Sequence, residues 1–527
     1  MNFPIALTYN FLIGFLALGL QQVWARVFSF SIGGSVVGFG SLGFMLALVG
    51  LGVGAFWGYR YCKAHRLDLT RFLVKALFLA CVFSYILMPL YSNLMVLLPL
   101  LGFVFWMPVY AVIFTAIGTT LPIMAHTVKR KPWQSVGRST GWLMSAFLGG
   151  AALSPWMSNL VFSAQMPPEA LMRFWAIALG VTPVLFFKMI DFRKASQKKG
   201  LLKLGAVTLV LLILLAYVDG HTSQKMFFKN IYNPQRSFAH HFKSIHGNIT
   251  AVTEEVGADS LYVNGAYHGR LSFDPVSTRN RIQRIYYVTS LHPDPSDVLQ
   301  INLSNGAWSS VIAGNPSTSS LTIVDPQLEI RKIIDRYSEI KPILHDEKID
   351  YFAVDGRRWL RKNPQKKFDM IVVNTAQTHE DHITHLLSED FIQLAKRHLK
   401  EGGLLSLNST GCDSVYRTMA NAFPYVTTVD QTVVGAFGAM QGDDDIVKSR
   451  LESFRPNGTV VFDSMNPQSR EVLETISQMS KENQRDALLN KSSLMTDNNM
   501  WCEYKEHIYV REINQIKNKV IKMILGD

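Results

Sequence analysis

The first 218 residues alternate between long apolar stretches and short polar ones. Seven of the apolar stretches approach the roughly 20 residues that a helix needs to cross a bilayer. The fourth is long enough to be tilted, to break at Pro108 or to make two short passes. We therefore predict an all-α polytopic membrane domain over residues 1–218. Its expected spans are 5–25, 36–58, 72–92, 95–125, 139–163, 169–189 and 201–218.

Small residues recur at a spacing of four within the second apolar stretch, at Gly50, Gly54 and Gly58. Glycines at this spacing form one face of a helix and let a second backbone approach closely. We expect this face to pack against another helix of the bundle. Gly34 and Gly38 repeat the spacing and carry the same expectation.

The pattern after residue 218 is that of a soluble protein. Residues 219–290 are predicted to be a linker followed by a small antiparallel sheet. Its expected strands are 244–252 and 261–265, the second of which ends at an Asn-Gly turn.

Residues 291–430 alternate between short apolar strands and helical stretches, which is typical of a parallel, Rossmann-like α/β domain. Residues 431–527 are predicted to be a C-terminal extension that completes the soluble domain. Ligands in such sheets bind at the carboxyl ends of the strands. The expected strands are 298–301, 321–324, 351–354, 370–373 and 404–407, and the segments at their ends are Asn302–Gly306, Asp325, Asp355 and Asn374–Gln377.

Charge separates the two halves of the chain. Residues 1–218 hold 17 Lys and Arg and three acids, which leaves 35 basic and 37 acidic residues for residues 219–527. The soluble half therefore has no basic excess with which to bind phosphates, and nucleic acid is excluded as a partner. The positive charge belongs to loops beside lipid head groups.

Basic residues concentrate in the loops 60–71, 129–138 and 188–199. The positive-inside rule places these loops in the cytoplasm of a multi-pass protein of the cell membrane. With seven spans the soluble domain is then exocytoplasmic. One miscounted helix would reverse that side.

Five short motifs occur through the soluble half in a fixed order. They are His292-Pro293-Asp294-Pro295, Val324-Asp325-Pro326, Asp355-Gly356-Arg357, His385-Leu386-Leu387 and Thr496-Asp497-Asn498-Asn499. In this order and spacing they resemble the polyamine aminopropyltransferase (spermidine synthase) family, in the branch with N-terminal membrane helices. This resemblance implies a fold of the class I methyltransferase type and transfer of an aminopropyl group from decarboxylated S-adenosylmethionine to a polyamine.

The resemblance implies nucleoside-binding positions that this chain keeps in part. Of the family's glycine-rich turn, Gly306 remains, and the other side chains of the turn would crowd a nucleoside. The ribose-binding acid falls on Ile323, and Asp325, two residues later, could replace it. The adenine-binding acid is kept as Asp355, followed by Gly356. Asp325 and Asp355 would also suit helix caps.

The family's two catalytic aspartates fall on Asn374 and Gln377. Amides are poor bases and carry no charge to hold a polyamine, so we expect these positions to be inactive. They would equally suit polar strand ends. The family's Tyr-His-Glu polyamine segment is not recognisable around Tyr286-Tyr287.

A histidine cluster follows these amides, at His379, His382 and His385. Histidines could ligate a metal or act as general bases. We favour a solvated polar lid and predict no metal site.

The soluble half contains two cysteines, Cys412 and Cys502. We expect them to lie close together if the domain is exocytoplasmic, where a disulfide could form. The sequence leaves open whether they are bonded.

Three functions agree with these features. The first is a membrane-anchored spermidine synthase-like protein that has diverged from aminopropyl transfer and binds a nucleoside, a polyamine or a partner. The second is an active aminopropyltransferase-like or S-adenosylmethionine-type transferase with altered chemistry. The third is a transporter or scaffold with a regulatory soluble domain. The lipid bilayer is the expected partner, a homo-oligomer is left open, and an S-adenosylmethionine-derived nucleoside is the one cofactor that the resemblance suggests.

Overall fold

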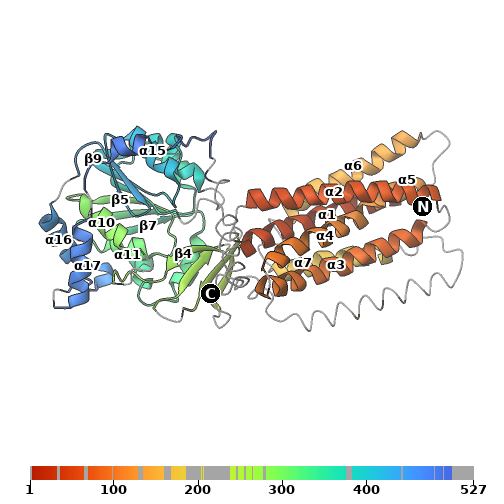
Figure 1. Ribbon diagram of the computed structural model, residues 1–527, viewed down its shortest axis with the longest axis horizontal. Helices are drawn as coiled ribbons and strands as arrows, with labels where there is room; N and C mark the ends of the chain where they lie inside the picture. Colours follow the sequence, from red (N-terminus) through yellow and green to blue (C-terminus); the bar gives the residue numbers. More distant parts are fainter. Residues whose placement is uncertain are drawn as a thin grey trace, which may run out of the picture. The chain divides into compact units, whose positions relative to one another are not determined.

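The computed structural model divides the chain into two compact units, Met1–Gln235 and Arg236–Asp527 (Figure 1). The structure describes residues 3–32, 36–64, 69–97, 99–128, 135–158, 168–185, 203, 206, 210, 238–244, 247–254, 257–263, 265–276, 281–375, 383–440, 443–463, 465–479, 481–490, 492–500 and 502.

The N-terminal unit is a bundle of apolar helices, as the sequence predicts. Four stretches of the described helices are long and apolar enough to cross a membrane: Phe3–Ala25, Ser41–Ala64, Phe72–Leu94 and Phe105–Thr127. The predicted seventh span, 201–218, lies almost entirely outside the described residues. The helices are α1 (Phe3–Ile32), α2 (Val36–Ala64), α3 (Leu69–Leu97), α4 (Pro99–Gly118), α5 (Thr120–Thr127), α6 (Val136–Met157) and α7 (Pro168–Leu185).

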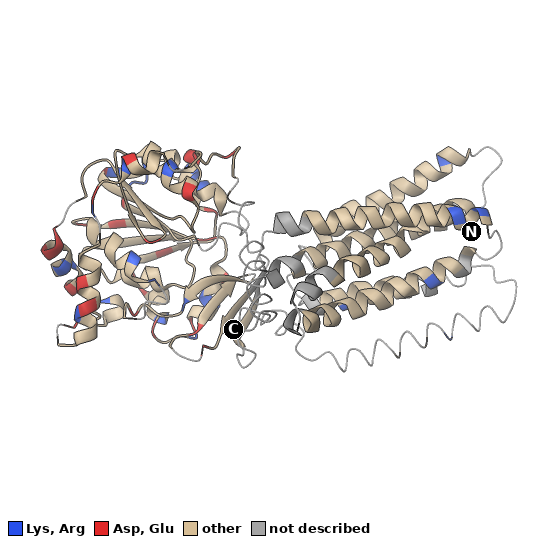
Figure 2. Ribbon diagram, viewed as in Figure 1, with Lys and Arg blue, Asp and Glu red and all other residues tan. Residues whose placement is uncertain are grey.

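The fourth predicted span is interrupted at Thr119, between α4 and α5, whereas Pro108 lies inside α4. The interruption is slight, because the Thr119 amide still bonds to the Thr115 carbonyl oxygen at 3.3 Å. Figure 2 shows that the described helices carry few charged positions, whereas the second unit carries acidic and basic positions throughout.

The glycine face of α2 packs on α4 and α5, which confirms the prediction for that face. A Cβ atom on Gly54 would lie 2.0 Å from the carbonyl oxygen of Thr115, and one on Gly58 would lie 2.7 Å from Pro122. The same close approach joins α1 to α6, where a Cβ on Gly150 would lie 1.9 Å from the Phe11 carbonyl oxygen. Any larger residue would force these helices apart. Gly34 lies outside the described residues.

The second unit begins with the predicted antiparallel sheet, which has four strands. Their order is β1-β2-β3-β4, and each neighbouring pair is antiparallel. Gly265, in the expected Asn-Gly turn, has φ 83°, a conformation that glycine adopts readily. The strands are β1 (Phe238–Ser244), β2 (Gly247–Val252), β3 (Ser260–Val263) and β4 (Ala266–Arg270).

A seven-stranded mixed sheet follows, in the order β10-β11-β9-β8-β5-β6-β7. Strands β5 to β9 are parallel, and β11 is antiparallel to both of its neighbours. This confirms the α/β fold class. The strands are β5 (Asp297–Ile301), β6 (Ser320–Val324), β7 (Ile349–Phe352), β8 (Phe368–Val373), β9 (Leu399–Asn408), β10 (Tyr425–Val429) and β11 (Thr432–Ala436).

Side chains alternate between two apolar cores, one on each face of this sheet. Val298 and Met370 face the first core, and Leu299 and Ile371 face the second. The first core is covered by α10 (Gln283–Leu291), α11 (Ala307–Ala313), α12 (Arg331–Ile334), α16 (Asp444–Ser453) and α17 (Pro467–Ser477). The second is covered by α13 (Gly356–Lys362), α14 (Glu389–Arg397), α15 (Asp413–Ala422) and α18 (Arg485–Leu489). Short 3₁₀ helices occupy Leu328–Ile330, Lys341–His345, Thr384–Leu386 and Pro456–Gly458.

Candidate functional site

The strand order reverses between β5 and β8, which lie side by side although β6 and β7 separate them in the chain. In open α/β sheets, ligands bind at the carboxyl ends of the strands at such a point. The segments that follow β5, β6, β7 and β8 therefore lie where such a ligand would bind.

The turn after β5 is held by its own side chains. Asn302, Ser304 and Gly306 all have positive φ, at 68°, 53° and 80°. Asn305 donates from Nδ2 to the Arg270 carbonyl oxygen at 2.6 Å, and Ser304 donates from Oγ to the carbonyl oxygen of His268 at 3.1 Å, so both anchor the turn to β4.

The expectation that these side chains would crowd a nucleoside is therefore not supported. Leu303, Ser304 and Asn305 are all buried within the fold. Gly306 is buried too, and a Cβ atom there would lie 2.9 Å from the side chains of Ile334 and Ile343. Gly306 thus has a structural reason to be glycine, independent of any ligand.

Asp325 follows β6 and stabilises the same turn. Its Oδ2 accepts from the Leu303 amide at 2.7 Å, and its Oδ1 accepts from the Gln327 amide at 2.6 Å. Burial raises the pKa of this carboxyl above its ordinary value, although these two amides lower it. Ile323 is fully buried in β6. The carboxylate of Asp325 is thus engaged by the protein's own backbone.

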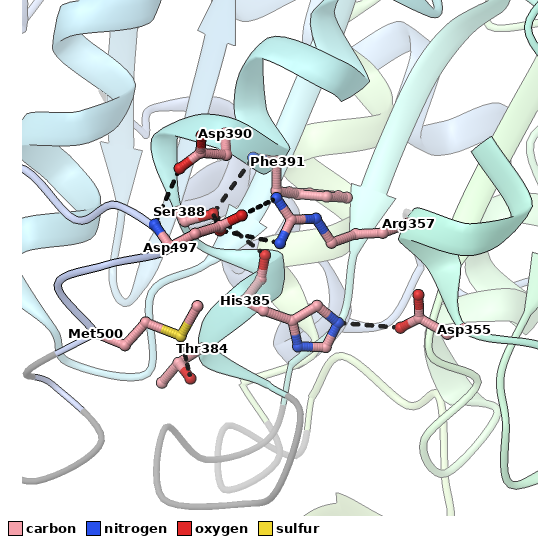
Figure 3. Close-up of polar contacts among 9 residues, drawn as sticks. All are labelled: Asp355, Arg357, Thr384, His385, Ser388, Asp390, Phe391, Asp497 and Met500. Carbon is pink, nitrogen blue, oxygen red and sulfur yellow. Dashed lines mark hydrogen bonds and ion pairs between the residues drawn. The ribbon is translucent and has the colours of Figure 1, made fainter. Parts of the chain in front are cut away.

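Asp355 follows β7 and makes two contacts with different consequences. Its Oδ1 accepts from the Arg358 amide at 2.9 Å and caps α13. Its Oδ2 lies 3.0 Å from Nε2 of His385 (Figure 3). Burial raises the pKa of Asp355, but His385 and the Arg358 amide lower it, and the net direction is down. Gly356 allows close packing here, because a Cβ atom would lie 2.6 Å from Ile301.

Asp355 also faces an open cleft of about 620 Å³. The carboxylate is 38% exposed, so a ligand in the cleft could still bond to it. One wall follows β6 and the other follows β7, and the lining residues are Pro326, Leu328, Glu329, Lys332, Ala353, Val354, Asp355 and Arg358.

Asn374 follows β8 at the point of reversal. Its backbone N–H donates to the Ile301 carbonyl oxygen at 2.9 Å, and the residue is 7% exposed. Gln377, His379 and His382 lie outside the described residues. Of the predicted histidine cluster, His385 is described and pairs with Asp355. Among the described residues, no group of three His, Cys, Asp or Glu could hold a metal ion.

The acidic C-terminal motif contacts α13 and the start of α14. Asp497 accepts two hydrogen bonds from Arg357 and one from Ser388 Oγ at 2.7 Å, and its amide donates to Asp390 (Figure 3). The disulfide between Cys412 and Cys502 attaches the same segment near the start of α15, with a Cα–Cα distance of 6.1 Å. This confirms the expected proximity of the two cysteines. The sequence identified the motif but not its arginine partner.

Sequence reasoning also missed Arg284, at the start of α10. Its side chain is 11% exposed, and its guanidinium carbon lies 5.6 Å from the centre of the Trp308 ring. Nη1 donates to Oδ1 of Asn408, at the carboxyl end of β9, at 3.3 Å. The arginine stands two residues before Tyr286, beside the segment where the resemblance implies polyamine-binding residues. That place in the sequence is a signal that could have identified it.

Comparison with known proteins gives distant relatives for the C-terminal part of the chain. No family model matches. The chain is 25% identical over 150 residues to the polyamine aminopropyltransferase of Streptococcus pneumoniae, a match that covers 27% of this chain and 52% of that protein. With the enzyme of Prochlorococcus marinus it shares 22% over 205 residues, or 35% and 71% of the two chains. The chain thus spans about half the length of the first of these relatives.

Two solved structures are also similar. The spermidine synthase of Thermotoga maritima aligns with a TM-score of 0.34 and 15% identity, covering 53% of this chain and 88% of that one. A spermidine synthase in complex with the transition-state analogue AdoDATO gives 0.32 and 14%, covering 53% and 87%. From the sequence matches, the C-terminal part of this chain is a distant homologue of the polyamine aminopropyltransferases.

Proposed function

We propose that this protein is a membrane-anchored spermidine synthase-like protein that has diverged from aminopropyl transfer and binds a nucleoside beside Asp355. The observation that carries the proposal is the amide of Asn374 at the reversal of the sheet, at the position where the resemblance expects a catalytic carboxylate. An alkylammonium has a pKa of about 10 and attacks only after it loses a proton. An amide cannot accept that proton, whereas a carboxylate could.

The nucleoside half of the site has better support. Asp355 remains charged and half-exposed at a cleft large enough for a nucleoside. Asp325 is a poor substitute for the ribose acid, because it is only 4% exposed and both of its oxygens accept backbone hydrogen bonds. We therefore expect recognition of the adenine-like edge of an S-adenosylmethionine-derived nucleoside to exceed recognition of its ribose.

A second function, an active transferase with altered chemistry, is favoured by the pair of Asp355 and His385. A carboxylate bonded to Nε2 fixes the orientation of the imidazole, and an oriented histidine can act as a general base. In that case the base would be His385, which lies between β8 and α14, and the carboxylate that orients it would be Asp355, which follows β7.

We place the α/β unit on the exocytoplasmic side of the cell membrane. The basic loops of the membrane domain support this orientation. The Cys412–Cys502 disulfide supports it independently, because disulfides persist in oxidising compartments and are rare in the cytosol.

Calorimetry on the purified full chain in detergent tests the proposal, with methylthioadenosine, S-adenosylmethionine, its decarboxylated form, putrescine and spermidine as ligands. We expect a nucleoside to bind and Asp355→Ala to weaken it about tenfold or more, the equivalent of one hydrogen bond to a charged group. Asp443→Ala is the matched control, because Asp443 also caps a helix, α16. It should lose a cap and keep nucleoside binding. Failure of every nucleoside to bind would overturn the proposal.

A further inference from the structure

A second site lies at the other end of the same sheet edge, around Arg284. Here the carboxyl ends of β9 and β10 meet the start of α10. A cavity of about 280 Å³ opens at this corner and is separate from the Asp355 cleft. Its lining residues are Arg281, Gln283, Arg284, Thr428, Val429, Asp430 and Met479.

The charges at this corner do not balance. Two arginines share one carboxylate: Asp430 lies 3.2 Å from Nη1 of Arg281 but 3.9 Å from Nε of Arg284. The closer partner is the more exposed arginine, since the side chain of Arg281 is 50% exposed and that of Arg284 is 11% exposed. The buried guanidinium is thus the one with the weaker anionic partner.

The contacts of Arg284 with neutral groups do not remove this excess. Its Nε donates to the Arg281 carbonyl oxygen at 3.1 Å, its Nη1 donates to Asn408, and Trp308 lies near its guanidinium. No described residue accepts a hydrogen bond from its Nη2. Burial lowers the pKa of Arg284 to about 10 even though Asp430 raises it, which indicates that the charge is incompletely compensated.

Thr375, just after β8, and Asn408, the last residue of β9, add hydrogen-bonding groups but no charge. Asn408 donates from Nδ2 to the Thr375 carbonyl oxygen at 2.6 Å, and the Thr375 hydroxyl donates back to the Asn408 carbonyl oxygen at 2.5 Å. This reciprocal pair holds the Asn408 side chain where its Oδ1 meets Arg284. The guanidinium is therefore fixed in position before any ligand arrives.

We propose that the cavity at Arg284 binds an oxyanion, a carboxylate or phosphate group of a small ligand, and not the cationic polyamine of the homologous enzymes. The arginine fork matches the oxygens of such a group, whereas a compact ammonium would be repelled by the two guanidiniums. The volume admits a small group rather than a polymer. This inference does not rest on nucleoside binding at Asp355, because its residues and its cavity are different.

The test measures binding of inorganic phosphate, succinate and putrescine to the full chain in detergent, by calorimetry at constant ionic strength. We expect phosphate or succinate to bind and putrescine not to bind at this site. Arg284→Gln should weaken anion binding at least tenfold. Asp430→Asn should strengthen it several-fold, because it removes the carboxylate that competes with the ligand. Arg361→Gln, a change at an exposed arginine of α13, is the matched control and should have no effect.

Three results would overturn the proposal. They are the absence of anion binding, an unchanged affinity in Arg284→Gln, and a loss of anion binding in Arg358→Gln instead, which would place the anion in the Asp355 cleft. If the Arg284→Gln variant does not fold, the anion affinity of the Asp430→Asn variant is the test. Tighter anion binding by that variant supports the site, and unchanged binding refutes it. Nucleoside binding measured on the same samples reports separately on the Asp355 cleft.

Discussion

Arg357 and Asp497 form a bidentate ion pair, with both N–O distances at 2.9 Å. The residues are 140 positions apart in the sequence, and the pair joins the start of α13 to the C-terminal segment. Ser388 adds a third hydrogen bond to the same carboxylate. Because Arg357 stands two residues after Asp355, this pair helps to fix the turn that carries the cleft carboxylate.

We expect Asp497→Ala to destabilise the full chain by roughly 1–3 kcal/mol, because it leaves a mostly buried guanidinium without its anionic partner. Arg357 is 9% exposed on its side chain, whereas Asp497 is 37% exposed, so solvent screening keeps the cost below that of a fully buried pair. The denaturant midpoint measures the change. Asp486→Ala is the control, since Asp486 forms an exposed pair with Arg485 and should cost less than about 0.5 kcal/mol.

Loss of the Cys412–Cys502 disulfide should destabilise the chain by roughly 2–4 kcal/mol, because the bond closes a long loop in the unfolded state. The two cysteines are 90 residues apart. Unfolding of the wild type with and without reductant, beside the Cys412→Ser, Cys502→Ser double variant, measures the effect. Reductant should not change the stability of the double variant. If both thiols are alkylated in the native, unreduced protein, there is no disulfide.

Acid should destabilise the α/β unit through Asp355 and Asp497, whose pKa values both lie below the ordinary range. Burial raises the pKa of each carboxyl group, but hydrogen bonds lower it by more than burial raises it. The donors are His385 and the Arg358 amide for Asp355, and Arg357 and Ser388 for Asp497. A depressed pKa contributes stability that is complete above the unfolded value of about 4 and is lost as the pH falls through the folded value.

Asp497→Asn should therefore flatten the loss of stability below about pH 4, which denaturant midpoints at pH 7, 4 and 3 would show. Asp325→Asn should have the opposite effect on the loss of stability in acid, because the pKa of Asp325 is raised. Removing that group should steepen the acid loss. Identical pH profiles for the wild type and Asp497→Asn would contradict the assignment.

The orientation of the chain gives a prediction that does not depend on the site. The loops near Lys63, Arg130 and Lys198 should be cytoplasmic and the C-terminus should not, because the basic residues cluster on alternate loops. Reporter fusions after Lys131 and at Asp527 measure the two sides. If both fusions report the same compartment, the span count or the orientation is wrong.

The fold could be predicted because its signals are repetitive. Long apolar runs indicate membrane helices, and short strands alternating with helices indicate a parallel sheet, whatever the individual residues do. The interruption at Thr119 instead of Pro108 shows the limit of this reasoning. A proline removes one backbone hydrogen bond, and the helix still continued through it.

The site was less predictable because its contacts join residues that are distant in sequence. Asp325 and Asp355 were expected from the strand ends, but their partners Leu303 and His385 follow from the packing of separate elements. The role of Arg284 depends on Asn408 and Asp430, more than 120 positions away. A local pattern contains no information about such pairs.

This protein should not make spermidine at a useful rate. The resemblance puts the family's catalytic carboxylates at Asn374 and Gln377, so we expect the base to be missing, and general-base catalysis is worth about a hundredfold to ten-thousandfold. Donor binding is weakened as well, because Ile323 is buried and apolar and the Asp325 oxygens already accept hydrogen bonds from Leu303 and Gln327. The two losses act on different steps, so they should combine.

An assay of the purified full chain with decarboxylated S-adenosylmethionine and putrescine measures this, beside the Asn374→Asp, Gln377→Asp double variant. We expect no turnover from the wild type. Activity that appears in the double variant would mean that the missing carboxylates were the main defect and that the donor still binds. Inactivity of both proteins would mean that the ribose position alone prevents productive donor binding, because the double variant carries both acids. Wild-type turnover of about 1 per second or more would contradict the divergence and leave the Asp355–His385 pair as the candidate base.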